Sequence, residues 1–168
     1  MSFFKSEKQP IDILLEISGI IVILGSFLFL TINYQDLPDS IPRHYGADGV
    51  PDAYGGKGVI WVLPAVGFVL YFVIGLISHV PGVINLPFKP APEQAEFYQK
   101  RYARMIRILN LAMVCVFAFL TYLSAQVGLG TQTQLPRFFT LVAVTLMISI
   151  PFAFIIPDMI KAKRQNRY

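Results

Sequence analysis

The chain of 168 residues is rich in apolar residues and poor in charge: 55% is hydrophobic, only 14% is charged, and the mean hydropathy is +0.58. Because soluble domains carry about 25% charged residues, this composition excludes an ordinary soluble domain. The formal net charge of +4 does not indicate nucleic-acid binding, since the basic residues stand beside long apolar runs. The single cysteine, Cys115, cannot form an intrachain disulfide.

Four apolar segments predict four transmembrane helices, over about residues 13–32, 59–80, 106–127 and 138–156. Each is long enough to cross a hydrocarbon core of roughly 30 Å as a helix. Backbone groups in lipid must bond internally, so apolar segments of this length are expected to be helices. The sequence therefore predicts a single all-α membrane domain over residues 1–168, a four-helix bundle. Small residues are expected at the helix contacts, namely Gly25, Gly67, Gly75 and Ala118.

The polar loop Tyr34–Lys57 separates the first two predicted helices. Its prolines favour extended backbone in the residues that precede them. Residues 41–45 are expected to form a short strand, and the glycines and aspartate of residues 46–49 indicate a turn. The loop is therefore expected to be a small hairpin or compact cap over the ends of the helices.

The same loop carries a spaced motif, Tyr-x-x-Leu-Pro-x-x-Ile-Pro-x-His-x-x-x-x-Gly-x-Pro-Asp-x-x-x-x-Lys. Its residues are Tyr34, Leu37, Pro38, Ile41, Pro42, His44, Gly49, Pro51, Asp52 and Lys57. The motif resembles that of a bacterial integral-membrane family of unknown function, shared with the N-terminal part of SdpI-type immunity proteins. The resemblance implies a non-enzymatic inner-membrane protein of immunity, signalling or accessory type. Such a protein would recognise a peptide or membrane-protein partner through the loop.

His44 supports an alternative hypothesis. With Asp39, Asp48 and Asp52 it offers imidazole and carboxylate ligands for a divalent ion, as in a metal-binding sensor or a small metal-dependent membrane enzyme. The spacing matches no known metal-ligand signature, and no motif for a catalytic nucleophile or a cofactor is present. The structural alternative is that the aspartates cap turns while His44 pairs with an acid to hold the hairpin.

The loop between the second and third segments predicts an interfacial helix at residues 93–104, which runs into the third transmembrane helix. Pro92 precedes it, and Glu96 and Lys100 form an i,i+4 pair in the favourable order. The cations Lys100, Arg101 and Arg104 either anchor this helix at the membrane boundary or bind anionic lipid headgroups.

The basic residues are distributed unevenly across the predicted membrane. All but three of the fourteen, from Lys5 to Arg167, flank the two termini and the middle loop. Arg43, Lys57 and Arg137 lie on the other side. The positive-inside rule therefore predicts cytoplasmic termini and an extracytoplasmic Tyr34–Lys57 loop.

A group of polar residues is expected at the inner ends of the helices. Its members are Asp12, Glu16, His79, Arg104, Arg107, Asn110 and Asp158. The favoured interpretation is a network of ion pairs that joins the helix ends, with Arg107 or His79 as the partner of Glu16. The alternative is a path for protons or ions, because ionisable residues within membrane spans are often functional.

Overall fold

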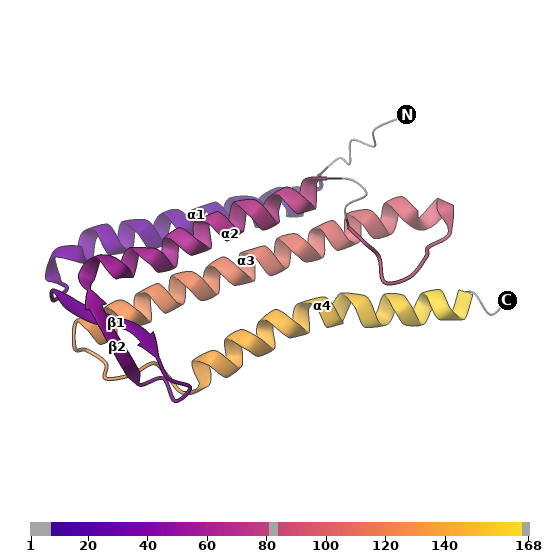
Figure 1. Ribbon diagram of the computed structural model, residues 1–168. Helices are drawn as coiled ribbons and strands as arrows, with labels where there is room; N and C mark the ends of the chain where they lie inside the picture. The colour runs from indigo at the N-terminus through magenta and orange to yellow at the C-terminus, as the bar shows by residue number, and fades with distance from the viewer. Residues whose placement is uncertain (1–7, 81–83, 166–168) are drawn as a thin grey trace.

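The computed structural model describes residues 8–80 and 84–165, which form four long helices and a two-stranded hairpin (Figure 1). The helices are α1 (Pro10–Asn33), α2 (Val62–His79), α3 (Ala95–Gly128) and α4 (Phe138–Gln165). The strands are β1 (Ser40–Tyr45) and β2 (Pro51–Gly56). All four helices are long and apolar enough to cross a membrane. Lys5 and Arg167 of the orientation argument lie outside the described residues.

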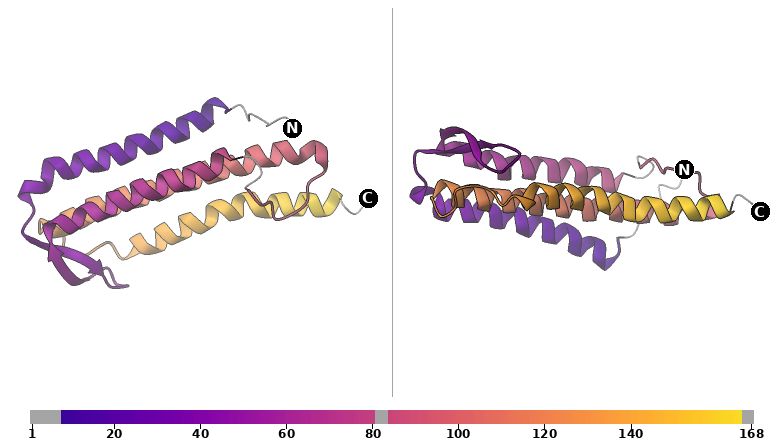
Figure 2. Two further views of the ribbon diagram at one scale, coloured as in Figure 1. Left: turned by 45° about the horizontal axis from the view of Figure 1, so that its top comes forward. Right: turned by 90° about the horizontal axis from the view of Figure 1, so that it is seen from below.

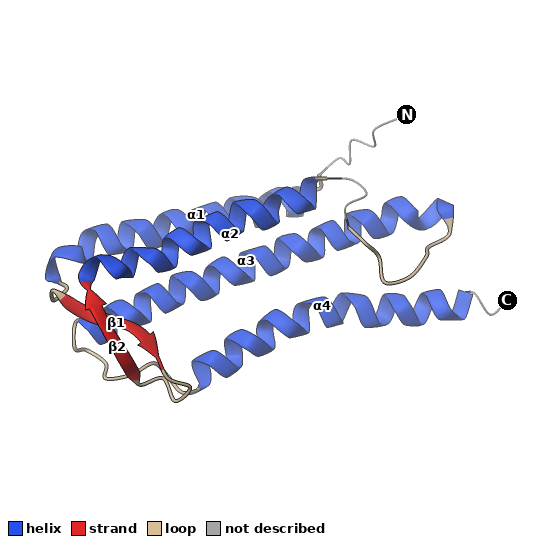
Figure 3. Cartoon of the chain, viewed as in Figure 1, coloured by secondary structure: helices blue, strands red, loops and turns tan. Residues whose placement is uncertain are grey.

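The four helices run side by side, and the hairpin lies across one end of them (Figure 3). Two turned views show the start of α1 and the end of α4 at the opposite end (Figure 2). Helices α1, α2 and α4 all pack on α3, which is the longest helix of the bundle. The most apolar stretch of α4 has no side chain buried within the protein, so this helix presents most of its surface to lipid.

The helix boundaries follow local sequence signals. At the start of α1, Pro10 occupies the first turn and Asp12 accepts a hydrogen bond from the Gln9 amide at 3.0 Å. The predicted interfacial helix and the third transmembrane segment form one continuous helix, α3. Helix α4 extends to Gln165, beyond the predicted end at residue 156, and contains both Pro151 and Pro157.

The buried side chains form three clusters along the bundle. The cluster below the hairpin contains Leu30, Leu37, Ile41, Ile60 and Ala125. The central cluster contains Ile23, Tyr71, Met113 and Val114. The third cluster joins α3 to α4 through Tyr98, Tyr102 and Met105.

Small residues bring the helices together, but not all at the expected positions. Gly67 is buried, and a Cβ atom there would lie 3.1 Å from Phe117. Gly75 faces Asn110, and Ala118 is half-buried. The prediction for Gly25 is wrong, because this residue is exposed and has no neighbour within 4 Å. The close contact of α1 with α2 is made at Gly19 instead, where a Cβ atom would lie 2.4 Å from the Tyr71 ring.

Candidate functional site

The Tyr34–Lys57 loop contains the antiparallel hairpin β1–β2, with Ile41 opposite Gly55 and Tyr45 opposite Pro51. The turn between the strands is closed by local hydrogen bonds. The Gly49 amide donates to the Gly46 carbonyl at 2.9 Å, and the Val50 amide donates to the Asp48 carboxylate at 3.0 Å. Gly49 has a φ of 82°, a left-handed conformation that favours glycine.

The hairpin is fixed to the end of the bundle at two places. Ile41 is fully buried and Leu37 is 3% exposed, and both pack in the cluster with Leu30 of α1. At the tip of the hairpin, the Leu135 amide of the α3–α4 connection donates to the Gly49 carbonyl at 2.9 Å. A side chain at residue 49 would collide with Leu135, since a Cβ atom would lie 2.6 Å from its carbonyl oxygen. These contacts hold the hairpin against α1 and against the α3–α4 connection.

The first and last residues of the motif also meet. The Lys57 ammonium lies 5.2 Å from the centre of the Tyr34 ring and 3.8 Å from the Asp39 carboxylate. The Lys57 amide donates to the Asp39 carbonyl at 2.9 Å, which closes the loop at its base. Tyr45 is half-buried, and burial raises the pKa of its phenol. Much of the motif therefore serves to shape and seat the loop.

Several other side chains of the hairpin are exposed. His44 and Asp52 lie across the two strands, with the His44 Nδ1 atom 2.6 Å from an Asp52 carboxylate oxygen. The side chains of this pair are 70% and 52% exposed. Tyr54, which is 58% exposed, and Val50, which is 42% exposed, lie on the same hairpin. We call these four residues the hairpin face.

The geometry does not support the metal hypothesis. His44 has Asp52 as its acidic neighbour, whereas Asp39 faces Lys57 and Asp48 accepts a hydrogen bond within the turn. Over residues 8–80 and 84–165, no group of three or more His, Cys, Asp and Glu side chains is placed to hold a metal ion. The His44–Asp52 pair instead matches the structural alternative, in which an acid holds the histidine across the strands.

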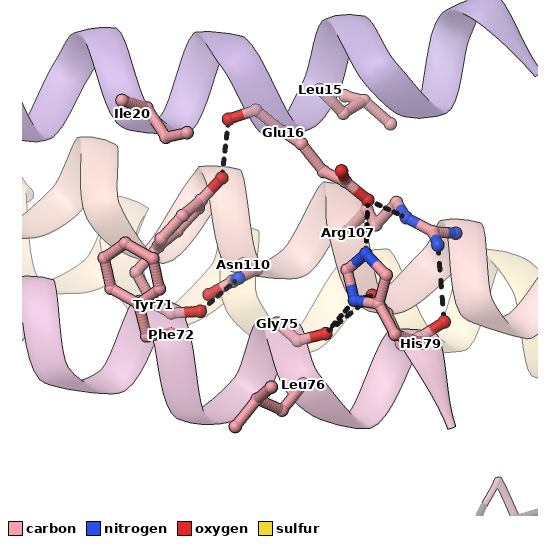
Figure 4. Close-up of a pocket in the computed structure, with 11 residues that line it drawn as sticks. Leu15, Glu16, Ile20, Tyr71, Phe72, Gly75, Leu76, His79, Arg107 and Asn110 are labelled. Atoms are coloured by element: carbon pink, nitrogen blue, oxygen red, sulfur yellow. Dashed lines mark hydrogen bonds and ion pairs between the residues drawn. The ribbon is translucent and has the colours of Figure 1, made fainter. Parts of the chain in front are cut away.

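At the opposite end of the bundle, the polar residues of α1, α2 and α3 form a network (Figure 4). A Glu16 carboxylate oxygen lies 2.8 Å from the Arg107 Nε atom and 3.0 Å from the His79 Nε2 atom, the two partners expected for it. Its other oxygen lies 2.7 Å from the Lys8 ammonium. Asp12 accepts from Arg104 at 2.8 Å. The network ties α1 to both α2 and α3.

Asp158 lies apart from this network. It is 1% exposed and accepts a hydrogen bond from the Arg101 Nε atom at 2.8 Å, which joins α4 to α3. The Arg101 guanidinium also stacks on Phe154, 4.8 Å from the ring centre. Lys100 pairs with Glu96 at 2.7 Å. The three cations considered for lipid headgroups, Lys100, Arg101 and Arg104, therefore each have a carboxylate partner within the protein.

Tyr71 belongs to the same end of the bundle and was not singled out in the sequence. Its hydroxyl donates to the Glu16 carbonyl at 2.6 Å, and its own carbonyl accepts from the Asn110 amide nitrogen at 2.9 Å. A small cavity bordered by Tyr71, Glu16 and Asn110 lies beside these bonds (Figure 4). The one available signal was a tyrosine in the interior of an apolar segment, where its hydroxyl requires a partner.

Comparisons with known proteins found a family match and a relative. Residues 21–68 match a family described as a domain of unknown function (DUF1648). This match spans the hairpin, the second half of α1 and the first part of α2. An uncharacterized protein from Archaeoglobus fulgidus is 27% identical over 150 residues, which cover 81% of each chain. No solved structure matches the chain. The protein is thus a multi-pass membrane protein, similar in its hairpin region to a family without an assigned function.

Proposed function

We propose that this protein is a non-enzymatic recognition protein of the cytoplasmic membrane, which binds a peptide or protein partner through the hairpin face. The observation that carries the proposal is the combination of firm attachment and exposure in one element. Ile41 and Gly49 fix the hairpin to the bundle, while His44, Asp52 and Tyr54 remain uncovered. A surface that is ordered before binding loses less conformational entropy when a partner docks.

The distribution of basic residues supports an extracytoplasmic position for the hairpin face, where it would meet its partner. Lys161 and Lys163 lie near the C-terminal end of α4. Arg104 and Arg107 lie in the N-terminal half of α3, which is on the side of the bundle away from the hairpin. The hairpin lies at the other end of the helices, so the positive-inside rule places it outside the cytoplasm and both termini inside. We take the whole chain, residues 1–168, as one transmembrane domain.

The sequence resemblance suggests which kind of biological role this recognition would serve. The hairpin region carries a motif that resembles one in the N-terminal part of SdpI-type immunity proteins, and the match to the family of unknown function covers the same residues. We therefore propose a role of immunity, signalling or accessory type in an inner membrane. In this role the hairpin face would contact a peptide or an integral-membrane partner.

Site-specific photocrosslinking in native membranes tests the proposal. A photoreactive amino acid is placed at Tyr54 on the hairpin face, and the control is placed at Leu141 of α4, which is 69% exposed on a lipid-facing helix. We expect one defined polypeptide, identified by mass spectrometry, to be captured from residue 54 and not from residue 141. Asp52→Ala should reduce this capture roughly tenfold, as is typical for loss of a residue important for binding. Equal capture from both positions, or no effect of Asp52→Ala, would contradict the proposal.

A further inference from the structure

The cavity at the polar end of the bundle has the composition of a lipid-binding site. It has a volume of about 170 Å³ and lies where α1, α2 and α3 meet. Leu15, Ile20, Phe72 and Leu76 supply apolar walls, and Arg107 and Asn110 supply polar atoms (Figure 4). Apolar walls beside a few fixed polar groups are typical of a site for a small amphiphilic group.

Asn110 borders this cavity and carries a buried hydrogen-bond acceptor. The residue is only 4% exposed, and its amide nitrogen donates to the Tyr71 carbonyl, which fixes the orientation of the side-chain amide. Its Oδ1 atom has no hydrogen-bond partner among the described residues. Buried polar atoms are nearly always hydrogen-bonded, so this atom indicates a donor that comes from outside the protein.

Arg107 presents donors three residues away on the same face of α3. Its side chain is 9% exposed, and its Nε atom donates to Glu16 while Nη2 donates to the Ser78 carbonyl at 3.3 Å. The Nη1 atom lies 3.9 Å from the Asp12 carboxylate, beyond hydrogen-bond distance. A guanidinium has five N–H groups, so donors remain for a further acceptor.

Glu16, Arg107 and His79 border the cavity, and the wider network to which they belong carries an excess of positive charge. The network contains the cations Lys8, Arg104 and Arg107 and the carboxylates Asp12 and Glu16. His79 also lies against Glu16, at 3.0 Å. Three permanent cations against two carboxylates leave an excess of positive charge at the end of the helices, where phospholipid headgroups lie. Basic pockets between transmembrane helices at this depth suit anionic headgroups.

We propose that this cavity binds an anionic phospholipid whose headgroup carries a free hydroxyl. The phosphate accepts hydrogen bonds from Arg107, and the hydroxyl donates to the Asn110 Oδ1 atom. Residues three apart on a helix are neighbours, so a phosphate and a hydroxyl of one headgroup span the two side chains. An acyl chain leaves along Leu15, Ile20 and Leu76 into the bilayer.

Fluorescence quenching by lipids with brominated acyl chains tests this proposal. The reporter variant combines Trp61→Phe with Phe72→Trp, so that its one tryptophan borders the cavity. The probes are brominated phosphatidylglycerol, with a phosphate and hydroxyls, and brominated phosphatidylethanol, with a phosphate alone. Brominated phosphatidylcholine measures ordinary lipid contact. The unmodified chain, whose single tryptophan is Trp61 near the hairpin, is the control.

We expect phosphatidylglycerol to be preferred over phosphatidylcholine by roughly tenfold at the reporter, with phosphatidylethanol between them; tenfold corresponds to one good polar contact. At Trp61 the three probes should quench equally. Asn110→Leu should abolish the preference for phosphatidylglycerol over phosphatidylethanol and leave both above phosphatidylcholine. Equal quenching by all three probes at the reporter would overturn the proposal, as would an unchanged preference in Asn110→Leu. The lipid comparison at the reporter does not depend on Asn110→Leu, so it decides the question even if that variant fails to fold.

Discussion

The two ends of the bundle are held together by different physical interactions. At the hairpin end, the buried cluster around Ile41 is apolar, and the Leu135–Gly49 backbone hydrogen bond adds a polar link to the α3–α4 connection. At the opposite end, Asp12, Glu16 and Asp158 each receive an arginine from α3. The hairpin end is therefore shaped by packing, and the other end by charge.

This difference determines how each end responds to substitution. Packing at the hairpin end requires space, so the sensitive positions are those where a Cβ atom has no room. Ion pairs at the other end require both partners. A buried charge without its partner destabilises the folded protein more than replacement of the whole pair by apolar residues does. Each end can therefore be weakened with a substitution that has a matched control.

The largest effect is expected for Arg101→Met. This change leaves the Asp158 carboxylate, whose side chain is 2% exposed, without its guanidinium partner. Removal of one partner from a buried pair should lower the free energy of unfolding by about 3 kcal/mol. The thermal unfolding of purified protein in detergent measures it. The double variant Arg101→Met with Asp158→Leu should recover most of the loss. If the double variant is no more stable than Arg101→Met, the pair does not explain the contact of α4 with α3.

A smaller loss is expected for Gly49→Ala at the hairpin end. The substitution imposes a left-handed conformation on alanine, and its Cβ atom meets the Leu135 carbonyl oxygen at 2.6 Å. We expect a loss of about 2–3 kcal/mol, from backbone strain and overpacking together. Gly130→Ala is the matched control, because Gly130 has a φ of 74° and no neighbour within 4 Å of its Cβ position. This control should lose only about 1 kcal/mol. Equal losses would show that the hairpin tip is not tightly seated on Leu135.

Gly19→Ala tests the contact between α1 and α2. The added methyl group would overlap the Tyr71 ring, so that α1 or Tyr71 must move, at a cost of about 1–2 kcal/mol. The matched control on the same helix is Gly25→Ala, where the space is open and alanine favours the helix. We expect this control to be neutral or slightly stabilising in the same unfolding assay. A loss at residue 25 as large as at residue 19 would contradict the described packing of α1.

The smallest effect on stability is expected for His44→Ala. Pairs between exposed side chains contribute between 0 and about 1 kcal/mol, and the His44–Asp52 pair is more than half exposed at both residues. Unfolding should therefore change little, while photocrosslinking from residue 54 should weaken. A loss of stability comparable to that of Gly49→Ala would contradict this expectation, because the exposed pair would then contribute as much to the fold as the buried contact.

The features that could be predicted from the sequence are those set by local pattern. Apolar length predicted the four helices, and the prolines and glycines of the loop predicted the hairpin. Charge type predicted the partners of Glu16, because a carboxylate near an arginine and a histidine at one membrane depth has few other choices. In each case the information lies in neighbouring residues or in a strong chemical preference.

The remaining features depend on which faces of the helices meet. Nothing local distinguishes Gly19 from Gly25, although one contacts Tyr71 and the other faces outward. The bond between Leu135 and Gly49 joins two loops that are distant in sequence. Arg101 reaches Asp158 because α4 continues past Pro157, beyond the end predicted for the fourth helix. Such contacts follow from the register of packed helices, which single-residue preferences do not specify.

The most direct test of the account is cysteine labelling of the two ends of the bundle. In a Cys115→Ser background, Tyr54→Cys marks the hairpin face and Lys161→Cys marks the exposed end of α4. Intact cells are treated with a membrane-impermeant maleimide, and lysed cells serve as the control for reactivity. We expect residue 54 to be labelled in intact cells, whereas residue 161 should be labelled only after lysis. Labelling of residue 161 but not of residue 54 in intact cells would contradict it, because the hairpin face would then lie in the cytoplasm.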